Sequence, residues 1–180
     1  MNPSTIIAGT MKWGAWGAKM NAVQVAATVH SALETGIHTF DHADIYGGYT
    51  TEADFGAGFE ESGIERSSVE FISKCGICYP ADGQAHAVKH YNYSSAHIRT
   101  SVENSLRNLR TDYIDLYLLH RPSPLMDAKE AVDALQQLQD EGKIKEWGVS
   151  NFTPSQVQLM ATQATPAWNC LLYTSPSPRD

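Results

Sequence analysis

Short apolar segments alternate along the chain with longer segments in which apolar residues recur at helical spacing. Buried strands are predicted at residues 37–41, 69–74, 113–120 and 144–150, with a weaker strand near residues 6–13 and a sixth from about residue 164. Between them, apolar residues three or four positions apart predict helices, as at Ile98, Val102, Leu106 and Leu109. The chain therefore repeats one unit, a strand followed by a helix.

The ends of the predicted helices carry capping residues. Asn21, Asp127 and Thr153 each stand three residues before a Gln or Glu, the spacing of a capping box in which each side chain bonds the other residue's backbone N–H. Pro154 stands at a first helical position, where its missing N–H costs no hydrogen bond. Three glycines stand where helices should end: Gly36, Gly63 and Gly142.

Strands that alternate with helices predict an α/β fold with a parallel sheet. A doubly wound sheet would carry G-x-G-x-x-G after its first strand, but residues 13–17 read WGAWG, and Gly56 and Gly58 fall in a predicted helix without a third glycine. The pattern instead favours a partial (β/α)8 TIM barrel, with about the first five and a half strand–helix units. Barrel enzymes carry their chemistry at the carboxyl ends of the strands.

Polar side chains stand at those strand ends. In a barrel the ends of consecutive strands converge on one pocket, so these side chains are expected to meet. They are the carboxylate of Asp41, the phenol of Tyr46, the ammonium of Lys74, the imidazole of His120, the hydroxyl of Ser150 and the amide of Asn151.

Composition narrows the classes of function. The 180 residues carry a formal net charge of −7 and no basic run, which argues against binding of nucleic acid through its phosphates. No apolar run approaches the ~20 residues that a membrane helix needs. The amino terminus has neither a basic leader nor a long apolar stretch, and three cysteines are too few for a disulfide framework. We therefore expect a cytoplasmic protein.

The strand ends together resemble the aldo-keto reductase family. Residues 41–47 match its D-x-A-x-x-Y-G signature, and Lys74, His120 and the pair Ser150-Asn151 match its further motifs. The resemblance covers about residues 5–169. In detail, the segments FDHADIYGGY, SKCGI, HRPSPLMDA and GVSNFTPSQ are most similar to the bacterial YdhF-type oxidoreductases.

The resemblance implies NADPH-dependent reduction of an aldehyde or ketone to an alcohol, with a small carbonyl compound as the substrate. Tyr46 would be the general acid, and the Lys74 ammonium is expected to lower the pKa of its phenol below the usual value of about 10. Asp41 would keep Lys74 charged and oriented. His120 would donate a hydrogen bond to the carbonyl oxygen and orient the substrate.

The resemblance also implies the cofactor contacts and bears on the end of the chain. Ser150, Asn151 and Asn169 would hold the carboxamide of NADPH. Residues 170–180, CLLYTSPSPRD, instead resemble a translated sequencing adapter, and they do not continue the periodicity that precedes them. We therefore expect residues 1–169 to be the N-terminal part of a single barrel, residues 170–180 to be a non-native tail, and this fragment to be inactive.

Other interpretations of these residues stay open. The family includes potassium-channel β-subunits, so a non-enzymatic, cofactor-binding regulatory subunit is an alternative. A metal-dependent barrel hydrolase would need ligands at several strand ends, and only residues 41–44 offer a cluster, so we expect no metal. Cys75 and Cys78 have redox or zinc spacing, but no second pair accompanies them. Residues 76–93 form either a wall of the substrate pocket or a solvated loop. The substrate, the choice between NADPH and NADH, and the oligomeric state are not predicted.

Overall fold

The computed structural model describes residues 1–171, and its main feature is one parallel sheet of six strands. Every neighbouring pair of strands is parallel. The predicted tail lies outside the described residues except for its first two. In spatial order the strands are β1 (Ala8–Gly9), β2 (Thr39–Asp41), β3 (Glu70–Cys75), β6 (Ile114–Leu119), β7 (Ile144–Ser150) and β8 (Trp168–Cys170).

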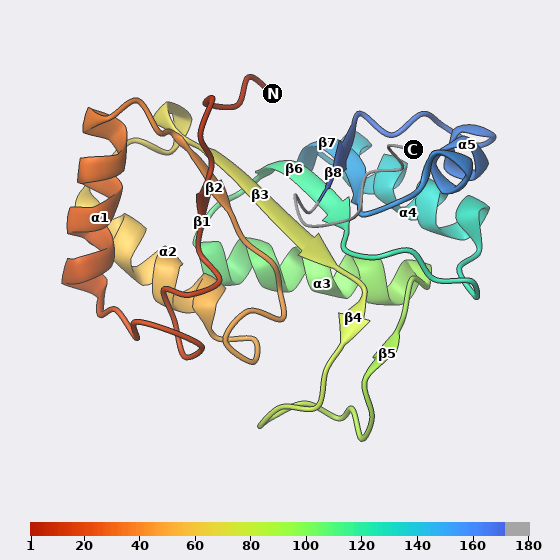
Figure 1. Ribbon diagram of the computed structural model, residues 1–180, viewed down its shortest axis with the longest axis horizontal. Helices are drawn as coiled ribbons and strands as arrows, with labels where there is room; N and C mark the ends of the chain where they lie inside the picture. Colours follow the sequence, from red (N-terminus) through yellow and green to blue (C-terminus); the bar gives the residue numbers. More distant parts are fainter. Residues whose placement is uncertain (172–180) are drawn as a thin grey trace, which may run out of the picture.

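A helix follows each of the first five strands of this sheet, so the predicted unit of strand and helix is confirmed. Each helix packs against the next, from the first to the fifth, and together they flank the sheet (Figure 1). The fold is therefore α/β, and the sheet and its helices form the first part of a (β/α)8 barrel. The helices are α1 (Ala22–Glu34), α2 (Thr51–Ser62), α3 (Ser95–Leu109), α4 (Ala128–Asp140) and α5 (Pro154–Ala161), and a 3-10 turn, η1, spans Arg66–Ser68.

The main core lies between the sheet and the helices. Side chains alternate between the two faces of a strand, so Phe71 points to the helices while its neighbour Ile72 points into the incipient barrel. Phe71 packs edge-on against the rings of Phe55 and Phe59 from α2. On the other face Ile72 joins Leu116 and Leu118 in a separate small cluster. The two faces therefore provide different surroundings for polar residues that follow each other in the sequence.

The predicted helix ends are confirmed with one correction. The capping boxes at Asn21 and Thr153 are both complete. At Asp127 the side chain accepts from the first turn of α4, but Glu130 accepts from the backbone N–H of Ser95 at 2.7 Å instead of returning to the cap. The predicted box is therefore only half formed, because Glu130 links α4 to the start of α3. All three predicted end glycines have positive φ.

Residues 76–93, expected to be a loop, contain a short hairpin instead. Strand β4 (Ile77–Cys78) pairs antiparallel with β5 (His90–Tyr91). The hairpin extends away from the carboxyl end of β3 (Figure 1). Two-residue strands carry too little alternation to be recognised in a sequence, which explains why the pattern did not predict them.

The described sheet is open at both sides. Strands β1 and β8 each pair with one neighbour only, so each leaves one row of backbone N–H and C=O groups without a partner strand. Among residues 1–171, no helix is both long enough and apolar enough to span a membrane.

We expect the 180-residue chain to self-associate when it is expressed as it stands, because open edges of β1 and β8 can pair with other copies. Sedimentation velocity at micromolar concentration should show a broad distribution of species above the monomer. A single monomeric species with one cooperative thermal transition would contradict this prediction.

Candidate active site

The carboxyl ends of β2 and β3 bring two opposite charges together inside the incipient barrel. In the parallel register Asp41 lies beside Ile72, and Lys74, two residues further on, points to the same face. The Lys74 ammonium donates to both carboxylate oxygens of Asp41, at 2.6 and 2.7 Å. The predicted pairing of Asp41 with Lys74 is therefore present in the structure.

Lys74 is surrounded by acceptors although it is only 3% exposed. Its ammonium also donates to the backbone carbonyl of His42 at 2.7 Å and to the Tyr46 hydroxyl at 3.3 Å. Burial opposes the charge, but the interaction with the Asp41 carboxylate and the hydrogen bonds outweigh it, so the pKa of Lys74 is raised. Lys74 is therefore held as an ammonium whose remaining contact is the Tyr46 hydroxyl.

A tight turn brings Tyr46 back to this ammonium. Gly47, Gly48 and Tyr49 all have φ between 65° and 73°, the left-handed region that favours glycine. A Cβ at Gly47 would lie 2.4 Å from the Thr51 hydroxyl oxygen, so only glycine fits there. The turn therefore needs its glycines both for conformation and for space, and it leads directly into α2.

The Tyr46 phenol does not behave as the sequence predicted. Burial raises its pKa, and Lys74 lowers it as expected, but burial and the nearby Asp41 carboxylate prevail. The expected net lowering of the Tyr46 pKa is therefore wrong for this structure. The phenol stays protonated through the neutral pH range, which is the form that can donate a proton.

His120 faces Tyr46 from the end of β6. The two rings meet edge to face, with centroids 6.1 Å apart. Burial lowers the pKa of His120 to about 3, with further contributions from Lys74, Arg121 and Lys89, so the ring is neutral. Its Nδ1 is buried and has no partner among the described residues. A neutral imidazole carries one N–H that it can donate to a ligand.

The backbone around His120 is fixed from the neighbouring strand and loop. Its N–H donates to the Cys75 carbonyl at 2.9 Å. The Tyr93 hydroxyl donates to the carbonyl of Arg121 and accepts from the Arg121 N–H, so it clamps the segment directly after the histidine. His120 is therefore positioned by main-chain contacts on both sides.

The residues between Asp41 and Tyr46 do not form a metal site with Asp41. His42 points to the helices, where its ring lies 4.3 Å from the Phe55 ring and its Nδ1 lies 2.9 Å from the Thr10 hydroxyl. Asp44 instead lines a cavity of about 300 Å³ beside α2 and α3. Strand alternation thus separates the three side chains that looked clustered in the sequence.

The predicted carboxamide contacts lie together at the ends of β7 and β8. The Asn151 amide donates to the Ser150 hydroxyl at 2.9 Å, and the Asn151 N–H donates to the Cys170 carbonyl. The Asn169 side chain, however, pairs with the backbone of Phe152, donating at 2.8 Å and accepting at 3.3 Å. The structure brings the three residues together, but the side-chain amide of Asn169 is hydrogen-bonded to the protein backbone.

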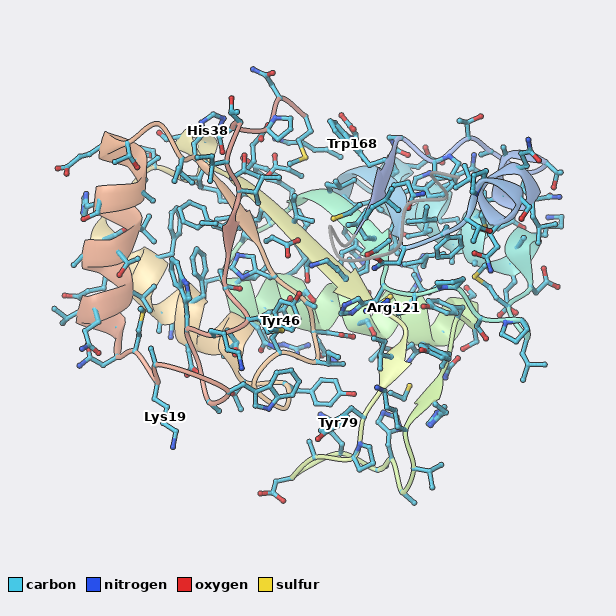
Figure 2. The ribbon with its side chains drawn as sticks, in the orientation of Figure 1. Lys19, His38, Tyr46, Tyr79, Arg121 and Trp168 are labelled. Atoms are coloured by element: carbon cyan, nitrogen blue, oxygen red, sulfur yellow. The ribbon has the colours of Figure 1, made fainter. Side chains whose placement is uncertain are left out.

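Two aromatic residues at the site were missed in the sequence. The Trp16 ring lies 6.5 Å from the Tyr46 ring and 6.0 Å from the Tyr79 ring. Tyr46 and Tyr79, labelled in Figure 2, lie toward the hairpin end of the sheet. Trp16 lies after the first strand. Because the active-site residues of barrel enzymes follow the carboxyl ends of the strands, this position could have been recognised in the sequence. Tyr79 belongs to the hairpin, which the pattern did not predict.

The chain is similar to proteins named as an oxidoreductase and a dehydrogenase. The oxidoreductase YdhF of Escherichia coli is 44% identical over 151 residues, which are 84% of this chain and 50% of YdhF. The glycerol dehydrogenase AKR11B4 of Gluconobacter oxydans superposes with a TM-score of 0.81 at 31% identity, covering 94% of this chain and 51% of that one.

A third relative carries a cofactor. The aldo/keto reductase of Klebsiella pneumoniae in complex with NADP and acetate superposes with a TM-score of 0.64 at 29% identity, covering 84% of this chain and 47% of that one. The chain spans about half the length of the curated relatives it matches. The sequence profile described as the Aldo/keto reductase family matches residues 5–175, and the chain belongs to that family.

Proposed function

We propose that the protein to which this chain belongs reduces aldehydes or ketones to alcohols, with NADPH as the reductant and Tyr46 as the general acid. The observation that carries the proposal is the line of contacts from the Asp41 carboxylate through the Lys74 ammonium to the Tyr46 hydroxyl. Family membership and the NADP complex of the Klebsiella pneumoniae relative support the class of reaction and of cofactor.

The reduction needs a proton at the carbonyl oxygen. Tyr46 can supply it, because its pKa is raised and its phenol is protonated at neutral pH. As the proton leaves, negative charge develops on the phenol oxygen, 3.3 Å from the Lys74 ammonium, which stabilises that charge more than it stabilises the neutral phenol. Lys74 therefore favours the transition state, and Asp41 acts through Lys74 as a positioning residue.

The neutral His120 ring is suited to hold the substrate. Its N–H can donate to the carbonyl oxygen without competing for the proton, because a pKa of about 3 keeps the ring uncharged. Trp16, beside Tyr46, offers an apolar surface against the carbon chain of the substrate. The side chains come from different strand ends, and the Tyr46 ring lies 6.5 Å from the Trp16 ring and 6.1 Å from the His120 ring.

The cofactor fits the end of β7. The Ser150 hydroxyl accepts from the Asn151 amide at 2.9 Å. A hydroxyl can accept and donate at the same time, so it could also donate to a carboxamide oxygen. NADPH, when bound, supplies the hydride that adds to the carbonyl carbon. Ser150 and Asn151 would hold its carboxamide, and Asn169 would join them after releasing the backbone of Phe152.

We further propose that residues 1–169 are the N-terminal part of a single barrel and that the 180-residue chain alone is inactive. The open sheet with free edges at β1 and β8 supports this proposal, and so does the half-length match to the curated relatives. The experiments on activity below therefore use the complete protein that carries these residues.

Tyr46→Phe should lower kcat for the reduction of an aldehyde such as glyceraldehyde by about 10²–10⁴-fold, because the general acid is removed. The Kd for NADPH, measured by fluorescence titration, should change little. Tyr113→Phe, at the opposite end of β6, is the matched control and should retain activity. Near-normal turnover by Tyr46→Phe would contradict the assignment of the general acid. If the unaltered protein binds NADPH but reduces no carbonyl compound, the alternative of a regulatory subunit is favoured.

Lys74→Met should reduce kcat about as strongly as Tyr46→Phe, and the double variant should be little worse than either. The two side chains act as one proton-donating unit, and losses within such a unit are not additive. A double-mutant cycle on kcat measures the coupling. Independent, multiplicative losses would show that the two residues do not act together.

Asp41→Asn should lower the pKa of Lys74 below its ordinary value of 10.5, because burial then acts without the carboxylate that outweighs it. Titration of the lysine Cε signals by NMR measures the shift. Asp133→Asn is the matched control, since Asp133 pairs at 2.5 Å with the exposed Lys129, whose titration should move little. An unchanged Lys74 titration in Asp41→Asn would overturn the positioning role.

A further inference from the structure

The hairpin that follows β3 gathers metal-binding side chains away from the Tyr46 site. One ligand atom from each of Cys78, His86 and His90 lies within 4.8 Å of the other two. Cys78 is in β4, His90 is opposite it in β5, and His86 lies in the connection between the two strands. The pairing of β4 with β5 therefore produces the cluster, and the sequence spacing alone does not reveal it.

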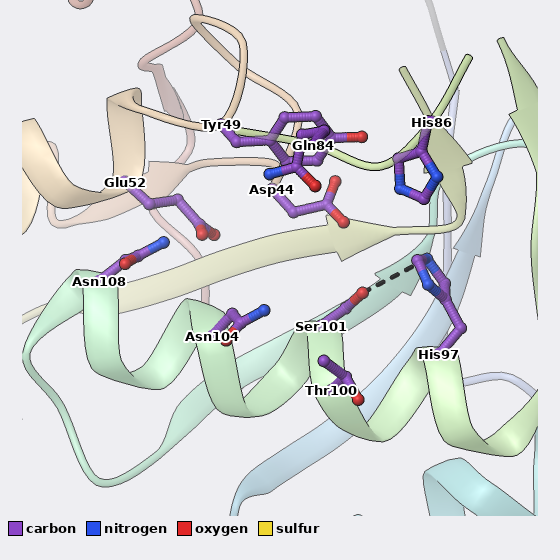
Figure 3. Close-up of a pocket in the computed structure, with 10 residues that line it drawn as sticks. All are labelled: Asp44, Tyr49, Glu52, Gln84, His86, His97, Thr100, Ser101, Asn104 and Asn108. Atoms are coloured by element: carbon purple, nitrogen blue, oxygen red, sulfur yellow. Dashed lines mark hydrogen bonds between the residues drawn. The ribbon is translucent and has the colours of Figure 1, made fainter. Parts of the chain in front are cut away.

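A fourth side chain joins the cluster from α3. The Nε2 atom of His97 lies 3.8 Å from the Cys78 sulfur. Ser94 caps α3 by accepting from the backbone N–H of His97, which fixes the first turn of the helix beside the hairpin. In Figure 3 the rings of His86 and His97 face each other across one end of the cavity beside α3. The hairpin therefore supplies three ligands within 4.8 Å of one another, and α3 places a fourth beside one of them, Cys78.

The histidine at the open side of the cluster is already set up as a ligand. The Nδ1 of His90 lies 2.9 Å from the Val88 carbonyl oxygen. A carbonyl can only accept, so this nitrogen carries the ring hydrogen and Nε2 is left with its lone pair. Ligating histidines usually have their second nitrogen held in this way, by a carboxylate or a backbone carbonyl.

We propose that Cys78, His86, His90 and His97 bind one zinc ion, which links the hairpin β4–β5 to the start of α3. Zinc favours imidazole and thiolate ligands, and four protein ligands form the closed tetrahedral site typical of a structural ion. Such a site holds its ligand atoms about 3.3–3.7 Å apart. Cys78 already lies 3.8 Å from His97, and the three hairpin ligands lie within 4.8 Å of one another. To complete the site, the hairpin ligands draw closer together and the His97 ring turns toward the two hairpin histidines.

The site differs from the C-x2-C chelate that the sequence suggests. Cys75 is fully buried at the end of β3, where it belongs to the core between sheet and helices. Only Cys78 points to the histidines. The proposal departs from the expectation of no metal: the proposed site consists of one cysteine and three histidines, and Cys75 takes no part in it.

The ion would also fix the rim beside Tyr46. Tyr79 follows Cys78 directly, and its ring contacts Trp16, which contacts Tyr46. The Tyr49 hydroxyl holds the same segment by donating to the Ile77 carbonyl and accepting from the Tyr79 N–H. Attachment of the hairpin to α3 therefore limits movement of the aromatic side of the site. Zinc binding itself does not depend on the proposed function.

The test uses the complete protein that carries these residues, with metal ions alone. Dialysis against zinc followed by elemental analysis should give one ion per chain, with a Kd below about 1 μM by chelator competition. Cobalt(II) in place of zinc should show the absorption of a tetrahedral ion with a thiolate ligand.

The variants locate the ion. Cys78→Ser should abolish the thiolate absorption, and His90→Asn, at an exposed position where folding is not at risk, should weaken binding at least about tenfold. Cys75→Ala and His30→Asn should bind zinc as the unaltered protein does. The proposal would be overturned if the unaltered protein does not retain zinc. It would also be overturned if Cys78→Ser and His90→Asn retain zinc as well as the unaltered protein does, or if Cys75→Ala loses zinc as they do.

Discussion

The buried charge of Lys74 is the constraint on which the site depends. An ammonium that is 3% exposed is costly unless acceptors surround it, and the acceptors must come from another strand. Asp41 meets this need only because β2 and β3 are parallel and in the observed register. The same requirement draws in the His42 carbonyl and the Tyr46 hydroxyl. The ion pair therefore connects the register of the sheet to the position of the Tyr46 hydroxyl.

The two faces of the sheet then divide the polar residues by role. Asp41 and Lys74 face the incipient barrel, whereas His42 faces the helices and packs against Phe55. Glu52, on α2, also lies on the helix side, where it accepts from Ser73 at 2.5 Å. Burial raises the pKa of Glu52. Asp115, which also faces the helices, instead forms ion pairs with Arg66 and Lys145. Burial opposes its charge, but these contacts lower its pKa. Each buried carboxyl group on the helix side is therefore set by its own partners, apart from the pair of Asp41 and Lys74.

The sequence predicted most of the sheet, and it predicted that polar side chains at the strand ends would lie together, because both depend on local signals. Strand ends follow from apolar runs, and caps such as Asn21 follow from spacing. Features that depend on distant contacts were not predicted: burial reverses the expected shift of the Tyr46 pKa, and Glu130 leaves its cap for Ser95. The cluster around Cys78 needs the pairing of two very short strands and the approach of α3, neither of which has a local pattern.

The central claim, that this site reduces a carbonyl group, is tested most directly by following the transferred hydrogen. The complete protein is incubated with NADPH deuterated at the transferable C4 position and with an aldehyde, and the alcohol is analysed by mass spectrometry and NMR. The account predicts one deuterium on the carbinol carbon, with the hydroxyl hydrogen taken from solvent. Alcohol without deuterium at that carbon, or no alcohol from any carbonyl while NADPH is bound, would contradict it.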